Sequence, residues 1–317
     1  AQHIQPGGSP APHPPEQRPL LIVGHGTVDV AGVAEFETFV ARMRDRLRAE
    51  GVEVEGGFIE LSAPAVTDVY SELMRRGHRG VVAVPLVLVA AGHGKGDIPA
   101  ALEREVRRHP GTGYIFGRPL GPHPVLLDLL AARIAESSGE QDPADTAVLL
   151  VGRGSTDPDA NAEVCKMARL LQETSGFTFV ETAFISLATP SVRQGLDRVR
   201  RLGARRVVVA PYFLFDGVLP QRVVTQAQQY GAEVADLDVT VCGYLGDTEE
   251  LADLVVERYR EALHGDIRMN CDTCAYRVML PGFEDKLGAP QTPHHHPDDP
   301  TAAGHGHGHG HGVSHAD

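Results

Sequence analysis

Two histidines and one glutamate stand directly after apolar runs in the first half of this chain. His25 and His93 each lie between two glycines, and Glu60 follows Phe-Ile. Imidazole is a good ligand for first-row divalent metals, and a nearby carboxylate can orient it or carry protons. If the apolar runs are neighbouring parallel strands, their carboxyl ends share one edge of a sheet, where open α/β sheets bind ligands. The three residues therefore predict one site that handles metal ions and protons.

The elements that would position these residues alternate between strands and helices. Apolar runs at residues 20–23 and 81–90 predict strands buried on both faces, and further strands are expected near 54–61 and 114–116. Apolar residues at helical spacing and capping residues predict helices near 33–50, after Ser62, over 98–109 and at 124–136, where the last helix closes the unit. The first half therefore has the pattern of an α/β unit.

The second half repeats this pattern, but without the chemistry. Val-Gly-Arg-Gly matches Val-Gly-His-Gly, and later strands and turns align at a near-constant spacing. The aligned site positions are Arg153 with His25, Ser186 with Glu60 and, without gaps, Leu219 with His93. A purely structural role, such as a histidine that only completes a turn, would predict like residues in both halves. The loss of every potential ligand instead predicts a single site in the first unit, facing a second unit that forms a wall.

The fold class expected is α/β, with two duplicated units that contain parallel sheets and are related by approximate two-fold symmetry. A cleft should lie between the carboxyl edges of their strands. The predicted segments are a disordered leader at 1–17, the catalytic unit at 18–139, the degenerate repeat at 146–264 and a Cys/His-rich tail at 265–317. An acidic linker with one proline joins the two units.

The tail has the composition of a metal-binding segment. Eight of the sixteen histidines lie from His294 onward, and such a stretch cannot build a core, so it should be disordered without metal. The accessory metal ligands expected there are His305, His307, His309 and His311. Met-x-Cys-x-x-Cys at 269–274 supplies a second group of potential ligands, Cys271 and Cys274. A zinc-binding or redox pair is one reading of these two cysteines.

The composition excludes several classes of function. The chain has 317 residues and a formal net charge of -13, whereas a general nucleic-acid binder needs a basic face. No apolar run is long enough to span a bilayer, and the first 18 residues lack the apolar core of a signal peptide. Four cysteines in a chain of this length do not suggest a disulfide framework. We therefore expect a cytoplasmic protein that binds neither nucleic acid nor membranes.

Three stretches carry a resemblance to a known family. Leu-Ile-Val-Gly-His-Gly, Phe-Ile-Glu-Leu-Ser-Ala-Pro and Val-Pro-Leu-Val-Leu-Val-Ala-Ala-Gly-His-Gly-Lys-Gly-Asp-Ile-Pro resemble the CbiX-type sirohydrochlorin chelatases, which are class II chelatases. The resemblance implies insertion of Co²⁺ or Fe²⁺ into sirohydrochlorin, in cobalamin or siroheme biosynthesis, with the tetrapyrrole between the two units. By motif match, His25 and His93 would bind the incoming metal and accept pyrrole protons, and Glu60 would assist proton removal.

The duplicated length and the tail resemble the long form of that family. That form implies an iron–sulfur cluster at Cys271 and Cys274. Because a cluster normally takes four cysteines, either two chains share one cluster as a homodimer or other ligands complete it.

Sirohydrochlorin carries carboxylate arms, so an acidic chain must present local basic groups to it. Arg153, opposite His25 in the repeat, and Lys95 are the candidates; a surface ion pair is the alternative for Arg153. The competing class of function is a non-enzymatic protein that stores or delivers cobalt or nickel. Ligand loss in the second half favours the enzyme, because a storage protein gains by keeping both sites.

Overall fold

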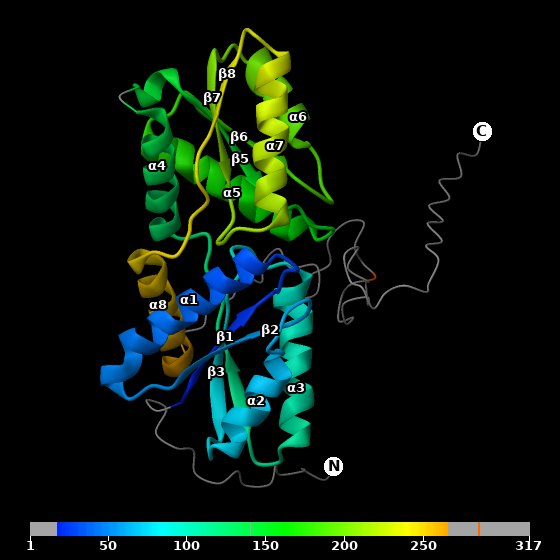
Figure 1. Ribbon diagram of the computed structural model, residues 1–317, viewed down its shortest axis with the longest axis vertical. Coiled ribbons are helices and arrows are strands. Elements are labelled where there is room, and N and C mark those ends of the chain that lie inside the picture. Colours follow the sequence, from blue (N-terminus) through cyan, green and yellow to red (C-terminus); the bar gives the residue numbers. More distant parts are fainter. Residues whose placement is uncertain (1–17, 140, 266–284, 286–317) are drawn as a thin grey trace, which may run out of the picture.

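Two parallel sheets form the core of the molecule, each in a separate α/β unit (Figure 1). The computed structural model describes residues 18–139, 141–265 and 285. The first sheet has the order β2-β1-β3-β4 and contains β1 (Leu20–Gly24), β2 (Val54–Phe58), β3 (Gly80–Pro85) and β4 (Gly113–Phe116). The second has the order β6-β5-β7-β8 and contains β5 (Ala147–Gly152), β6 (Phe179–Phe184), β7 (Arg206–Pro211) and β8 (Asp238–Val241). This architecture confirms the predicted duplication of a parallel α/β unit.

Helices follow the strands in both halves. The first four are α1 (Val30–Leu47), α2 (Val66–Arg75), α3 (Ile98–Arg108) and α4 (Pro124–Ser138). The second four are α5 (Pro158–Ser175), α6 (Val192–Arg201), α7 (Val218–Glu233) and α8 (Glu249–His264). Short helical turns are η2 (Arg48–Glu50), the π-helical η3 (His93–Asp97) and η4 (Pro143–Asp145). The described residues contain no helix long and apolar enough to cross a membrane.

The central strands are apolar because helices cover both of their faces. Every residue of β1 is buried, and its neighbours pair with it in parallel register, Leu20 opposite Val54 on one side and Val82 on the other. β5 is likewise buried along its whole length. In both units this arrangement brings the turns that follow neighbouring strands to one edge of the sheet.

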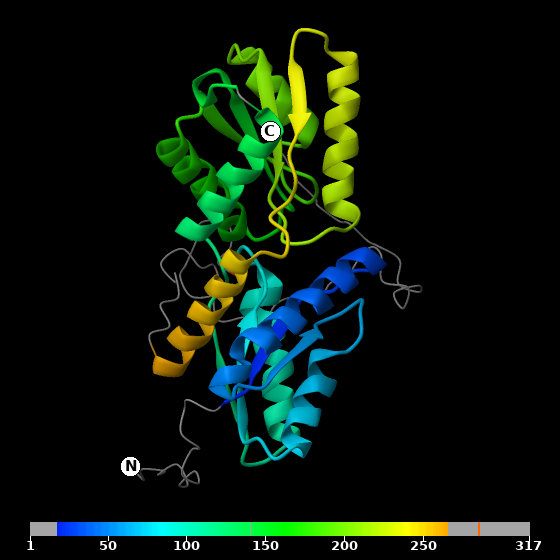
Figure 2. The same ribbon diagram turned by 60° about the vertical axis from the view of Figure 1, so that its left-hand side comes forward.

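The last helix of each half packs on the sheet of the other half. α8 returns to the first unit and packs against β3 and α1, whereas α4 packs against β7 and α5 of the second unit (Figures 1 and 2). Arg258 of α8 is buried there and donates to the carbonyl oxygens of Pro119 and Leu120. The expectation that the helix near 124–136 closes the first unit is therefore wrong. An amphipathic pattern predicts a helix but does not say which apolar surface the helix covers.

The third strand is shorter than its apolar run. The run from 81 to 90 predicts a strand of that length, but β3 ends at Pro85. Leu86 and Leu88 are buried in a core cluster that also contains strand residues of the second sheet, such as Val208. Burial between the two units, and not strand pairing, explains why this segment is apolar.

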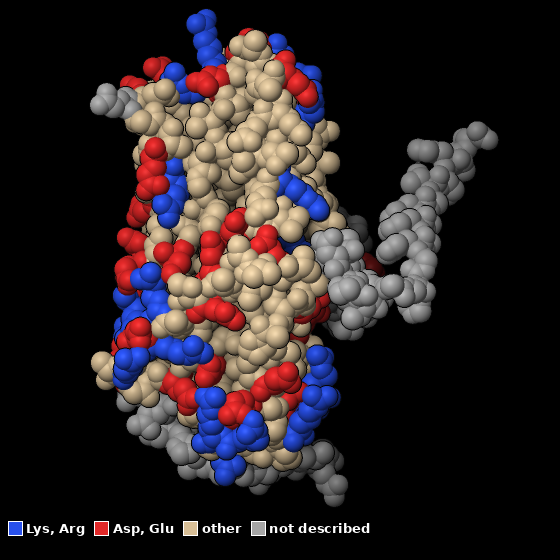
Figure 3. Space-filling view, in the orientation of Figure 1, with Lys and Arg blue, Asp and Glu red and all other residues tan. Residues whose placement is uncertain are grey.

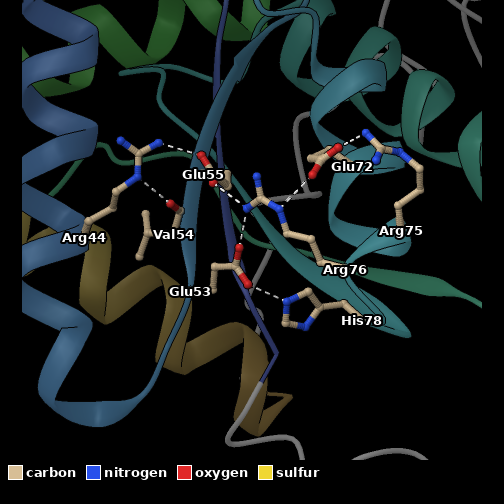
Figure 4. A network of polar contacts seen from close by, with 8 residues as sticks. All are labelled: Arg44, Glu53, Val54, Glu55, Glu72, Arg75, Arg76 and His78. Atoms are coloured by element: carbon tan, nitrogen blue, oxygen red, sulfur yellow. Dashed lines mark hydrogen bonds and ion pairs between the residues drawn. The ribbon is translucent and has the colours of Figure 1, made fainter.

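Charged side chains cover the open edge of the first sheet. β2 is an edge strand, and Arg76 forms ion pairs with Glu53, Glu55 and Glu72, while Arg44 also pairs with Glu55 (Figure 4). Acidic and basic side chains are intermixed over this face of the unit (Figure 3). Such a charged rim discourages another chain from pairing with the exposed strand.

Candidate active site

Two glycines let the turn after β1 pass close to the neighbouring turn. A Cβ atom on Gly24 would lie 2.9 Å from the ring of Phe36, and one on Gly26 would lie 1.8 Å from the carbonyl oxygen of Glu60. Gly26 also has a φ of +104°, in the region that favours glycine. His25 is thereby held against the segment that carries Glu60.

The turn after β2 completes this contact. The Glu60 amide donates to the carbonyl oxygen of His25 at 3.2 Å, and the Ser62 amide donates back to that of Glu60 at 2.7 Å. The second bond closes a γ-turn centred on Leu61, whose φ is +64°. As a result, Nε2 of His25 lies 3.3 Å from Oε1 of Glu60. Two of the predicted site residues are therefore adjacent.

Arg153 reaches the same imidazole from the second unit. Its Nη1 lies 3.4 Å from Nε2 of His25. Burial lowers the pKa of Arg153, and the negative charge of Glu60 opposes that shift. The replacement seen in the repeat thus puts a cation beside the histidine, and the two units meet at this point.

The partners of His25 define two states of its ring. A guanidinium can only donate, so the contact with Arg153 makes Nε2 an acceptor, and Nδ1 then donates to the carbonyl oxygen of Gly26 at 3.1 Å. When the ring is protonated, Nε2 can donate to Glu60 instead. The lone pair of Nε2 can therefore accept either a proton or a metal ion at the edge of the sheet.

The turn after β3 contributes the third predicted residue. His93 opens η3, which follows β3 on the same sheet; its imidazole lies outside what the structure describes. The described side chains contain no group of three or more histidine, cysteine, aspartate or glutamate residues able to hold a metal. His25 and Glu60 supply one nitrogen and one carboxylate, and a further ligand from η3 remains a prediction.

Lys95 has a different environment from the one expected for a substrate-binding cation. Its Nζ lies 2.7 Å from Oδ2 of Asp157 and 2.8 Å from Oδ2 of Asp159, and all three side chains are buried. Burial alone lowers the pKa of Lys95, but the hydrogen bonds to the two carboxylates outweigh it and raise the pKa. The ammonium is thus held between the units and does not face an incoming ligand.

Beside this ion pair lie two groups that the sequence did not suggest. Glu163 of α5 accepts a hydrogen bond from the Ala90 amide at 2.9 Å, and burial raises the pKa of its carboxyl to about 7. The nearby hydroxyl of Tyr212 is buried with no hydrogen-bond partner among the described atoms. The signal for Glu163 was its alignment with Glu35, a residue type that both halves share. A comparison of the halves for lost ligands does not single it out, because the residue type is the same in both.

The remaining candidates lie elsewhere or beyond the description. A cavity of about 580 Å³ beside β2 has none of the predicted site residues in its lining. The structure leaves Cys165 and Cys242 as free thiols, exposed and buried respectively. Cys271, Cys274 and the tail histidines 305, 307, 309 and 311 lie outside the described residues, as does the leader 1–17.

Comparison with known families agrees with this geometry. A family model described as CbiX matches residues 19–137 and 147–262. The chain belongs to the CbiX family. The two matched ranges contain both turns of the His25 site as well as Arg153 and η3. The resemblance drawn from the three sequence stretches is therefore confirmed.

Several relatives in the CbiX family have names that specify a reaction. The chain is 38% identical over 263 residues to a sirohydrochlorin cobaltochelatase of Priestia megaterium, covering 82% of this chain and 85% of the relative. It is 30% identical over 244 residues to a sirohydrochlorin ferrochelatase of the same organism, covering 77% and 90%. The solved structure of SirB from Bacillus subtilis with Fe³⁺ matches with a TM-score of 0.70 at 25% identity, covering 80% of this chain and all of that one.

Proposed function

We propose that this chain is a sirohydrochlorin chelatase, which inserts Co²⁺ or Fe²⁺ into the tetrapyrrole. The observation that carries the proposal is the position of His25, whose Nε2 lies within 3.4 Å of both a carboxylate and a guanidinium where the two units meet. The names of the CbiX relatives, which include both cobaltochelatases and ferrochelatases, support the same reaction.

The reaction requires groups that bind a cation and groups that remove protons. Insertion of one divalent ion releases two pyrrole N–H protons, so the charge of the ring nitrogens balances the charge of the metal. The Nε2 lone pair of His25, with His93, binds the incoming metal. Glu60, 3.3 Å from that nitrogen, accepts a pyrrole proton or takes it from the imidazole.

Arg153 supplies the charge that the substrate needs. A planar guanidinium pairs well with carboxylate groups, and sirohydrochlorin carries several of them. When a carboxylate arm binds Arg153, the guanidinium moves its hydrogen bonds to that arm and leaves the lone pair of His25 for the metal. Substrate binding and activation of the metal ligand are thereby coupled.

The test is metal insertion by the full chain. Sirohydrochlorin and Co²⁺, mixed anaerobically with protein, should convert to the metallated ring, followed by absorbance, faster than without protein. Fe²⁺ and Ni²⁺ in place of Co²⁺ identify the preferred metal. His25→Ala and His93→Ala should each abolish or greatly slow conversion while the fold stays intact, because both changes lie in turns. A wild-type chain that binds metal without converting the ring would instead be a storage or delivery protein.

The tail adds a second, independent proposal. Cys271 and Cys274 bind an iron–sulfur cluster, shared between two chains as a homodimer or completed by other ligands, and the tail histidines bind divalent metal. The Cys-x-x-Cys spacing and the histidine content support this proposal. Iron and sulfide content of anaerobically purified protein, with Cys271→Ser as control, tests it. The cytoplasmic location and the lack of nucleic-acid or membrane partners also remain predictions.

A further inference from the structure

A buried ion pair joins the two units beside the candidate site. Lys95 lies in η3, the π-helical turn that begins at His93, and its ammonium contacts Asp157 and Asp159 of the second unit at 2.7 and 2.8 Å. The side chains of the three residues are only 6%, 3% and 5% exposed. Ions are costly to bury, and removing one partner of such a cluster leaves an uncompensated buried charge, so the three residues constrain one another's position.

The two carboxylates are held rigidly on the second unit. Asp157 is the N-cap of α5. Its Oδ1 accepts a hydrogen bond from the Asp159 amide, and its Oδ2 accepts one from the Lys95 ammonium. Four residues after Asp159, Glu163 accepts from the Ala90 amide, just ahead of η3. The first turns of α5 therefore hold the segment that leads into η3 and η3 itself.

The duplication provides an internal comparison for this contact. By alignment, Gln221 stands where Lys95 stands, and Asp29 stands where Asp157 stands. The equivalent pair, Gln221 and Asp29, is also in contact, but its amide–carboxylate distance is 3.5 Å and the contact is exposed. The glutamate contacts, in contrast, are alike, since Glu35 accepts from the Asp216 amide at the same 2.9 Å. Of the two equivalent contacts, the one that Lys95 makes from η3 is charged and buried, and the one that Gln221 makes is neither an ion pair nor buried.

From this asymmetry we infer that Lys95, Asp157 and Asp159 are positioning residues that fix the η3 turn, and with it His93, at a set place relative to His25. The stretch from Arg153 to Glu163 then touches both parts of the candidate site, His25 directly and η3 through Lys95. The second unit, which lost its own ligands, is the support that sets the position of the η3 backbone relative to His25. The inference rests on the proposed chelatase function.

The experiment compares the two equivalent positions, Lys95 and Gln221, in the chain of 317 residues. Lys95→Met should raise the KM for Co²⁺ by about 10- to 100-fold, the usual effect of losing a residue that orients a metal ligand. The KM for sirohydrochlorin should stay within about twofold, because the tetrapyrrole contacts are unchanged. The matched control, Gln221→Met, should leave both constants at their wild-type values. A merely destabilised fold would lower the amount of active enzyme, and hence kcat, without changing either KM.

A triple variant keeps the test decisive if Lys95→Met does not fold. Lys95→Met with Asp157→Asn and Asp159→Asn leaves no uncompensated charge, so it should fold and should still show the raised KM for Co²⁺. A wild-type KM for Co²⁺ in this variant, or equal constants for Lys95→Met and Gln221→Met, overturns the positioning role alone. Absence of metal insertion by the wild-type chain overturns the proposed function and this inference with it.

Discussion

At the scale of single residues, the proposed chemistry depends on the position of one nitrogen. Nε2 of His25 has a carboxylate oxygen at 3.3 Å and a guanidinium nitrogen at 3.4 Å. The carboxylate can accept a hydrogen bond from this nitrogen, whereas the guanidinium can only donate one to it. Under the proposed function, a carboxylate arm of the substrate that binds Arg153 would take the guanidinium away from this nitrogen.

Arg153→Met should raise the KM for sirohydrochlorin about 10- to 100-fold, because it removes a hydrogen bond to a charged carboxylate of the substrate. Steady-state rates at saturating Co²⁺ measure this effect. Arg193→Met, at an exposed arginine on α6, is the control and should leave KM unchanged. A fall in kcat with an unchanged KM would instead show that Arg153 acts on His25 alone.

Glu163 predicts a dependence of stability on pH. Its side chain is 7% exposed, and burial raises its pKa from 4.5 to about 7. A carboxyl whose pKa is higher in the folded state stabilises the fold below pH 4.5, and this contribution is lost as pH rises through about 7. The loss amounts to about 3 kcal/mol in the free energy of unfolding.

Glu163→Gln should therefore be more stable than the wild type at pH 8 and should show no such advantage at pH 4.5. Urea unfolding at the two pH values measures the difference. The mirror change Glu35→Gln is the control, because the Tyr244 hydroxyl also donates to that carboxylate, and it should give no gain at pH 8. Equal pH profiles for the wild type and Glu163→Gln would contradict the assignment.

At the scale of elements, both halves keep one unusual turn. Leu187, like Leu61, is the centre of a γ-turn, with a φ of +59° and a 2.7 Å bond from the Ala188 amide to the Ser186 carbonyl. Left-handed backbone disfavours residues other than glycine. Both turns lie against the turns that carry His25 and Arg153, so each half uses the same device to bring two strand ends together.

Leu187 allows this turn to be tested with little change in burial, because it is 61% exposed. Leu187→Gly should raise the free energy of unfolding by about 0.5 to 1 kcal/mol, and Leu187→Val should lower it by more than about 1 kcal/mol. Thermal unfolding provides the measurement. Leu202→Val is the control, since Leu202 is 59% exposed with an ordinary φ of -74°, and it should change stability by less than about 0.5 kcal/mol. A destabilised Leu187→Gly would show that the leucine side chain matters more than the backbone.

The sequence predicted the elements better than their partners. The apolar run before His25 and the glycines beside it were sufficient to predict a strand and a turn, because local sterics determine both. The partners of Lys95 could not be predicted, because Asp157 and Asp159 lie more than sixty positions away, on α5. The sequence also could not predict which sheet α4 covers, because the apolar face of this helix could pack on either unit.

At the scale of the molecule, α8 completes the first unit. Its Gly265 cap donates to Ala262, and its side chains fill the first unit. A chain that stops after Gly265 should insert Co²⁺ at the full rate when metal is saturating and lose rate only when metal is limiting. In that case the tail histidines raise the local supply of metal.

The control for this truncation is a chain that stops after Asp247 and therefore lacks α8. It should fail to fold, because it uncovers the apolar surface that Leu251, Leu254 and Tyr259 bury. Circular dichroism and activity of both truncations check these expectations. Inactivity of the longer truncation at saturating metal would place the tail or its cluster in the catalytic machinery.

Because α8 follows the second sheet in the chain but packs on the first, its position also determines the order of assembly during protein synthesis. β1 to β4 leave the ribosome long before α8, and at about 5–20 residues per second the first sheet waits on the order of ten seconds for its covering helix. Throughout that interval an apolar face of the nascent chain is open to chaperones and proteases. The first unit, which contains His25 and Glu60, is thus completed only when α8 has been synthesised.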